Sequence, residues 1–264
     1  MNASSLQSQV DALVQIVNPS GWTQIESRAD HDAAFNALRQ AIKTEPALLN
    51  AHGSQRGYGL LHHLAWGAGN QMGQYLLEQG ADPCLQADGG LTPLSLACGY
   101  GQAQCPLARQ LATVGRTPDN LRVAASLGEM DRVDSIVNAK SFPSTEAFEG
   151  REPWDAAYGF APSPHSNDPE RVLLDALAFA ARNGQLTTAQ LLLDQGIDVN
   201  GIDYLAPALH WAALYNQNAM VDFLIASGAR LDLRDREYGA TASEWAAYFK
   251  NDALASKLAR AAGT

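Results

Sequence analysis

Histidine and cysteine are the residues of this chain whose chemistry could include metal binding or nucleophilic catalysis. The six histidines lie at positions 31, 52, 62, 63, 165 and 210, and none has an HExxH or comparable metal spacing. The adjacent pair His62 and His63 would point to two sides of a helix, which makes it a poor chelator. The three cysteines, Cys84, Cys98 and Cys105, contain no CxxC pair. The chain also lacks GxSxG, GxxxxGK and dinucleotide-binding motifs. These absences predict no catalytic residues, no metal and no cofactor, and so not an enzyme.

The segment ALHWAALYNQ, residues 208–217, sets a histidine beside a tryptophan and could line a site, but it recurs along the chain. Residues 175–200 (DALAFAARNGQLTTAQLLLDQGIDVN), 207–232 (PALHWAALYNQNAMVDFLIASGARLD) and 59–82 (GLLHHLAWGAGNQMGQYLLEQGAD) align without a gap. Partial copies begin at Thr92, Asp119 and Thr241. The copies begin at intervals of 33, 27, 56, 32 and 34 residues. A repeat of two short helices explains this periodicity.

The period near 33 and the pattern T-P-L-H-x-A-A resemble the ankyrin repeat. Thr92-Pro93-Leu94 matches the signature literally, and Leu209-His210 with Ala212-Ala213 matches it within the helix. The resemblance covers roughly residues 57–261. It implies an all-α ankyrin-repeat solenoid of about six to seven helix-turn-helix repeats, with short fingers, degenerate caps and one long insertion rich in proline and aromatic residues.

The residue types also suit such a fold physically. Thr92 can cap a helix whose first turn holds Pro93. Three glycines follow the predicted second helices, where a left-handed residue is needed: Gly80, Gly196 and Gly228. The position of Trp211 is occupied by Leu96, Val123, Phe179 and Trp245 in other repeats, which indicates a packing column. In ankyrin repeats the histidine at the positions of His62 and His210 bonds backbone between adjacent repeats.

Four regions follow from this repeat pattern. Residues 1–56 are expected to form N-terminal capping helices and a degenerate repeat, beginning with an amphipathic helix that contains Leu6, Val10, Leu13 and Val17. Ankyrin repeats are expected over 57–139, an insertion loop over 140–171, and further repeats with a C-terminal cap over 172–264. The insertion contains five prolines and several aromatics, including Trp154 and Tyr158. These aromatics either fold back over neighbouring helices or contact a partner.

Composition and charge restrict the class of partner. The chain has 28 acidic and 18 basic residues, for a net charge of -10, so it has few cations to neutralise phosphates. Nucleic acid and anionic membranes are therefore disfavoured, and a basic protein partner fits better. No segment approaches the ~18 apolar residues of a membrane span, and the start lacks a signal-peptide pattern. The sparse, odd set of cysteines favours a reducing compartment, so we expect a cytoplasmic protein.

The resemblance places the two residues after the paired alanines on the concave groove, and the fingers beside it. Acids on or near the fingers, such as Asp82, Asp88, Asp198, Asp203, Asp232, Asp235 and Glu237, are expected to form a negatively charged rim. Tyr and Trp are enriched at binding hot spots. The alternative is that several of these aromatics pack against neighbouring repeats. With the insertion aromatics included, the predicted partner-binding residues are Tyr58, Trp66, Tyr100, Arg182, Tyr204, Leu214, Tyr215, Tyr238, Tyr248, Phe249, Trp154 and Tyr158.

The leading hypothesis is a non-enzymatic, monomeric, bacterial-type module that binds a protein or peptide through its groove and fingers. A narrower form is an inhibitor or immunity-type protein that blocks a basic enzyme, or an adaptor. The alternative, from another class, is a ligand-binding or enzymatic protein whose site forms around the 140–171 insertion. A pocket of converging polar groups beside Trp154 and Tyr158 would favour that alternative.

Overall fold

The computed structural model describes residues 3–17, 28–66, 70–115, 121–139, 169–202 and 205–263. These residues form two compact units, an N-terminal unit of residues 3–115 and a C-terminal unit of residues 121–263. The boundary falls inside the segment 57–139, which was expected to form one block of repeats. Apart from two isolated β-bridges, the described residues form helices and turns and no β-strand. This confirms the all-α prediction.

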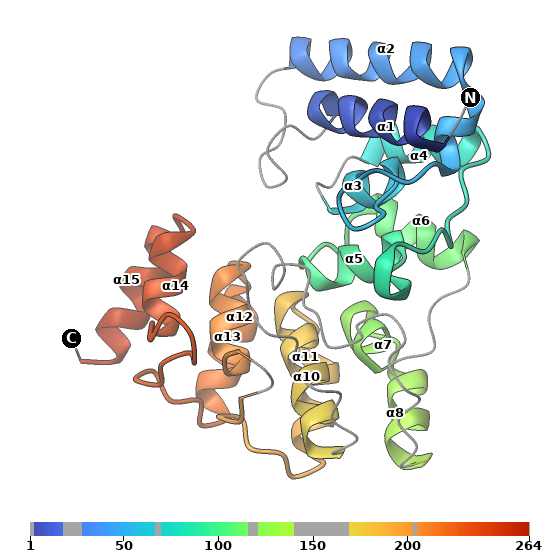
Figure 1. Cartoon of the computed structure of the whole chain (residues 1–264). Coiled ribbons are helices and arrows are strands. Elements are labelled where there is room, and N and C mark those ends of the chain that lie inside the picture. Colours follow the sequence, from blue (N-terminus) through green and yellow to red (C-terminus); the bar gives the residue numbers. More distant parts are fainter. Residues whose placement is uncertain are drawn as a thin grey trace. The chain divides into compact units, whose positions relative to one another are not determined.

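The described residues of the N-terminal unit form three helix pairs and two short 3₁₀ helices. Its elements are α1 (Ala3–Val17), α2 (Arg28–Thr44), η1 (Pro46–Asn50), α3 (Leu60–Trp66), α4 (Asn70–Glu78), η2 (Asp88–Gly90), α5 (Pro93–Gly99) and α6 (Pro106–Val114). The predicted amphipathic helix at the N-terminus is present as α1, and it buries Val10, Leu13 and Val17. Within this unit α1 packs on α3 and α3 on α5, as Figure 1 shows.

The described residues of the C-terminal unit form four helix pairs. They are α7 (Leu121–Leu127) with α8 (Met130–Ala139), α10 (Pro169–Arg182) with α11 (Leu186–Leu193), α12 (Ala208–Leu214) with α13 (Asn218–Ala226), and α14 (Ala242–Tyr248) with α15 (Asp252–Ala261). The helix α10 starts at Pro169, so residues 169–171 of the predicted insertion are helical. The rest of the insertion, residues 140–168, lies outside the described residues. The helices α7, α10, α12 and α14 stack in that order (Figure 1).

Small residues allow the first helices of successive pairs to pack closely. Ala180, Ala212 and Ala246 are completely buried in α10, α12 and α14. Trp211 and Trp245 are buried in the same stack, and their rings meet edge to face with centroids 5.1 Å apart. Burial of one large apolar side chain contributes roughly 1.5 to 3 kcal/mol, so this column supplies much of the stability of the unit. The packing column predicted around Trp211 is confirmed.

The ends of the helices follow the predicted chemistry. The Thr92 hydroxyl accepts a hydrogen bond from the Ser95 backbone N–H, and Pro93 occupies the first turn of α5. Thr241 caps α14 in the same way, and the Glu244 side chain accepts from the Thr241 N–H to complete a capping box. Gly80, Gly196 and Gly228 have φ values of +95°, +86° and +95°, so the predicted left-handed helix exits are confirmed.

Side-chain amides join each helix pair of the C-terminal unit to the pair before it. Gln185 donates to the Ser126 carbonyl, and Gln217 donates to the Arg182 carbonyl. Asn251 donates to the Ala213 and Leu214 carbonyls at 3.1 and 3.0 Å. Each amide lies just before the second helix of its own pair and satisfies a carbonyl at the C-terminal end of the preceding first helix, where helices leave carbonyls unpaired. Hydrogen bonds therefore reinforce the stack at every step.

The stack continues directly from α7 to α10, although residues 140–168 separate α8 from α10 in the sequence. Arg122 of α7 forms an ion pair with Asp175 of α10, and both side chains are largely buried. The Arg122 guanidinium also lies 5.7 Å from the centre of the Phe179 ring. A buried ion pair of this kind fixes the register between two helices, because either charge alone would be costly to bury.

Candidate functional site

The C-terminal end of α14 presents two exposed aromatic side chains. Tyr248, the last residue of the helix, is 81% exposed, and Phe249, its C-cap, is 41% exposed. Their rings pack edge to face with centroids 5.1 Å apart. Large aromatic groups that stay in water are unfavourable unless something covers them, so this pair is a candidate contact for another molecule.

The preceding helix pair places two further apolar residues at the same end of the stack. Leu214 and Tyr215 follow the paired alanines of α12, as Tyr248 and Phe249 follow those of α14, and both are half-buried. The hydrogen bonds from Asn251 to the end of α12 hold the two helix ends next to each other. We name these four residues the aromatic edge.

In the preceding helix pair, α10 and α11, the residue equivalent to Leu214 and Tyr248 is covered by other side chains. Arg182 ends α10 and is fully buried, with its guanidinium carbon 3.7 Å from the Trp211 ring centre and 4.5 Å from that of Phe179. The following pair, α12 and α13, supplies that cover. Arg182 was predicted to bind a partner, but its side chain is enclosed by the stack. The predicted groove residues are thus exposed only towards the end of the described array.

A finger loop beside α14 is organised around Asp235. Its carboxylate accepts hydrogen bonds from the backbone N–H groups of Glu237, Tyr238 and Ala240 and from the Trp245 indole, at 2.6 to 2.9 Å. Burial raises the pKa of this carboxyl, but the bonds from Tyr238 and Trp245 outweigh it, and the pKa lies below its ordinary value. Asp235 is buried, so the prediction that it lies on an acidic rim is corrected. The Tyr238 side chain is 60% exposed.

The two histidines at equivalent repeat positions are structural, as predicted. His210 contacts the Ala240 carbonyl through Nε2 at 3.1 Å, and His62 contacts the Leu91 carbonyl through Nε2 at 2.9 Å. The Gly59 N–H donates to Nδ1 of His62, which fixes that imidazole as neutral with its proton on Nε2. Burial lowers the pKa of both side chains, that of His62 to about 4. Both imidazoles therefore bridge neighbouring repeats and are poorly suited to acid–base catalysis near neutral pH.

The remaining predicted binding residues lie elsewhere. Tyr58 and Tyr100 are buried in the N-terminal unit, so they present no exposed ring there. Trp66 ends α3, and its side chain is outside the described part of the structure. Tyr204, Trp154 and Tyr158 also fall outside the described residues, as does the alternative site around the insertion.

Comparison with known proteins matches the C-terminal unit to one family. Two overlapping segments, residues 161–235 and 177–262, match the family model described as Ankyrin repeats (3 copies). Residues 161–262 of the chain therefore carry ankyrin repeats. The chain is also 32% identical over 150 residues to the ankyrin repeat domain-containing protein SAT10 of Stachybotrys chartarum. That match covers 51% of this chain but only 7% of the length of that curated relative.

Ankyrin repeats indicate a protein-interaction module, and the ankyrin fold is generally non-enzymatic. Within the described residues, no group of three or more His, Cys, Asp or Glu side chains could hold a metal ion. The same residues include no helix that is both long and apolar enough to cross a membrane. The matched region contains α10 to α15, and therefore the aromatic edge and the Asp235 finger.

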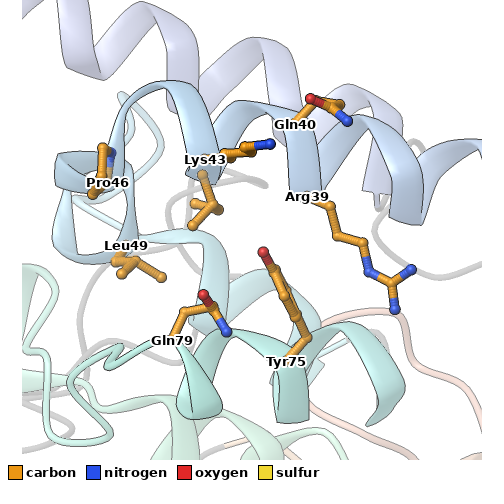
Figure 2. Close-up of a pocket in the computed structure, with 8 residues that line it drawn as sticks. Arg39, Gln40, Lys43, Pro46, Leu49, Tyr75 and Gln79 are labelled. Carbon is orange, nitrogen blue, oxygen red and sulfur yellow. The ribbon is translucent and has the colours of Figure 1, made fainter.

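One pocket of the N-terminal unit was not predicted. It has a volume of about 360 Å³ and lies between α2, η1 and α4 of the N-terminal unit (Figure 2). Phe35, Arg39 and Lys43 recur every four residues along α2, which places them on one face of that helix. This spacing was the sequence signal from which the basic face of α2 could have been predicted. Tyr75 lines the pocket from another helix, and the residues around it in the sequence do not indicate that it lies near Arg39.

Proposed function

We propose that this chain is a non-enzymatic binding module that holds a protein partner against the aromatic edge and the neighbouring finger. The observation that carries the proposal is the exposed pair Tyr248 and Phe249. The pair is mounted on a rigid support, because α14 has a complete capping box and Asn251 ties its C-terminal end to α12. Rigid aromatic side chains bury large areas with little loss of conformational entropy, which is why they dominate binding hot spots.

The chemistry of the surrounding surface favours a partner that carries Lys or Arg next to apolar side chains. Asp198, Asp232 and Glu237 are exposed in the fingers of the C-terminal unit, and the chain carries a net charge of -10. Long-range attraction of this kind speeds encounter with a basic surface and is weakened by salt. A basic enzyme held by an inhibitor or immunity-type protein is the narrower form of the proposal. We further propose that the protein acts as a monomer in the cytoplasm.

The experiment is affinity capture from extract of the native cell, followed by reconstitution with the purified partner. Three forms of the chain serve as bait: the unaltered protein, the double variant Tyr248→Ala, Phe249→Ala, and the control variant Leu186→Ala. Leu186 is an exposed apolar residue on α11, so its truncation removes a similar kind of surface away from the aromatic edge.

We expect the double variant to weaken binding of the purified partner by roughly 1 to 3 kcal/mol per aromatic residue, the range of a hot spot. The Leu186→Ala control should bind like the unaltered chain. Equal affinity for all three forms would remove the aromatic edge as the binding site. A partner whose affinity does not change between low and high salt would contradict its proposed basic character.

A further inference from the structure

The pocket of the N-terminal unit combines cations with an aromatic wall. Arg39 and Lys43 line it from α2, and Tyr75 lines it from α4. In Figure 2 the ring of Tyr75 stands between the two helices with its hydroxyl directed towards α2. The Arg39 guanidinium carbon lies 4.0 Å from the ring centre of Phe35 and 5.6 Å from that of Tyr75. The two rings are themselves 5.6 Å apart and edge to face.

The contact with two aromatic rings positions the guanidinium of Arg39 but leaves its N–H groups available. A cation–π contact uses the face of the ring and involves no hydrogen-bond acceptor. Among the described residues, neither Arg39 nor Lys43 forms an ion pair with a carboxylate. An oriented guanidinium with free donors is the group that binds carboxylate and phosphate in a two-pronged geometry.

The distribution of charge gives a second reason to expect an anion. Arg39 and Lys43 are four residues apart on one helix, so their like charges repel. Among the described residues, no acidic side chain lines the pocket, although acids outnumber bases by 28 to 18 in the chain. Lys43 lies in the last turn of α2, where a cation is favoured by the helix dipole. Arg39 lies a full turn earlier, and the dipole does not account for its position.

The floor of the pocket is apolar. Ile42 and Leu49 are buried, and Pro46 of η1 completes this part of the lining. A volume of about 360 Å³ is at the lower end for pockets that hold small molecules. The pocket therefore offers room for one ring or short aliphatic group in addition to a charged group.

We propose that this pocket binds a small organic anion, with one carboxylate or phosphate group carried on an aromatic or aliphatic body. Arg39 and Lys43 hold the anionic group, the Tyr75 hydroxyl donates a hydrogen bond to it, and Ile42 and Leu49 contact the apolar body. This site is separate from the aromatic edge and does not depend on the proposed function.

Calorimetric titration of the full chain with matched probes tests the proposal. The probes are benzoate, phenyl phosphate and the neutral isostere benzamide, each with a single ring. We expect at least one anion to bind with a Kd of about 1 mM or below, a value suited to a ligand of this size, and the amide to bind at least about tenfold more weakly. A preference between the two anions distinguishes a carboxylate ligand from a phosphate ligand. Equal binding of the anions and the amide would overturn the proposal, as would no binding of either anion up to about 10 mM.

Two variants of equal charge locate the site. Arg39→Gln should weaken binding of the preferred anion at least about tenfold, whereas Arg109→Gln should leave it unchanged. Arg109 is an exposed residue of α6 in the same unit and does not line the pocket. Tyr75→Phe keeps the ring and removes the hydroxyl, and it should weaken binding about threefold or more without lowering the melting temperature. Equal effects of the two arginine variants would mean that general charge attracts the probe, and would overturn the assignment.

Discussion

His62 in the N-terminal unit and His210 in the C-terminal unit occupy the same place in their repeats, but their surroundings differ. His62 stacks on Tyr58 with ring centres 5.5 Å apart, and the buried His63 follows it in the chain. His210 meets Trp245 edge to face, and the indole of Trp245 donates to the carboxylate of Asp235. The interior of the N-terminal unit thus relies on neutral imidazoles, while that of the C-terminal unit includes a carboxylate satisfied by four donors. The two units should respond differently to substitution and to pH.

The largest expected effect comes from a charge placed at one repeat position in either unit. Leu76 and Leu192 occupy equivalent positions in α4 and α11, and both are completely buried. Leu76→Asp and Leu192→Asp should each cost several kcal/mol, because a carboxylate would be buried without a partner. Hydrogen exchange should show lost protection mainly in the substituted unit. If either variant melts like the unaltered chain, the repeat register at that position is wrong.

The second largest effect is expected from acid, which should lower the stability of the N-terminal unit. Burial lowers the pKa of His62 and of His63 to about 4, from a usual value near 6.5. The unfolded chain therefore binds more protons than the folded chain between these pH values, and stability falls as the pH drops from about 6.5 towards about 4. Between pH 7 and pH 5 we expect a loss of about 1 to 2 kcal/mol for each of these histidines.

Hydrogen exchange at pH 7 and pH 5 separates the response of the two units. His210 is the corresponding histidine of the C-terminal unit. Burial lowers its pKa, while the contact with the Ala240 carbonyl and the charge of Asp235 offset part of that effect. The loss of protection should therefore be greater in the N-terminal unit. An equal loss in both units would contradict this account of the difference.

A neutral substitution of nearly the same shape tests how much the Asp235 carboxylate contributes to stability. Asp235→Asn should destabilise the C-terminal unit by about 1 to 3 kcal/mol, since an amide cannot reproduce all four charge-assisted bonds. Its lowered pKa means that the stabilisation is present above about pH 4 and is lost at lower pH. Denaturant titration measures the effect, with Asp232→Asn as the exposed control. Equal stability of the two variants would show that the four bonds contribute little.

The smallest effect is expected at the exposed end of the stack. Tyr248→Ala should change the free energy of unfolding by no more than about 0.5 kcal/mol, as is usual for an exposed position. Thermal melting checks this prediction. A much lower melting temperature would make the aromatic edge part of the core instead of a contact surface.

The repeats could be predicted from the sequence because their determinants are local and periodic. Thr92 and Pro93 begin a helix, Gly196 ends one, and Trp211 recurs in a column that must be buried. The role of His210 followed from its place in the repeat. Each of these properties depends on residues within one or two turns, or on the neighbouring copy of the same pattern.

The site was harder to predict because exposure depends on what lies over a residue. Arg182 and Tyr248 have equivalent sequence positions, but the following helix pair covers Arg182, whereas Tyr248 belongs to the last described pair and is exposed. Asp235 resembled a surface acid, and only the folded loop brings three backbone N–H groups and the Trp245 indole to it. The pocket of Arg39 and Tyr75 lies between α2 and α4, and α2 precedes the residues that show the repeat pattern.

The amides of Gln185, Gln217 and Asn251 have a mechanical consequence. Each of them bonds only to the helix pair immediately before its own, so the C-terminal unit is held together by contacts between neighbouring pairs. A pulling force applied to its two ends would pass through every such contact equally, and the weakest would yield first. The unit should therefore lengthen in steps of about one repeat when it is stretched, and should recover by adding repeats to those that remain folded.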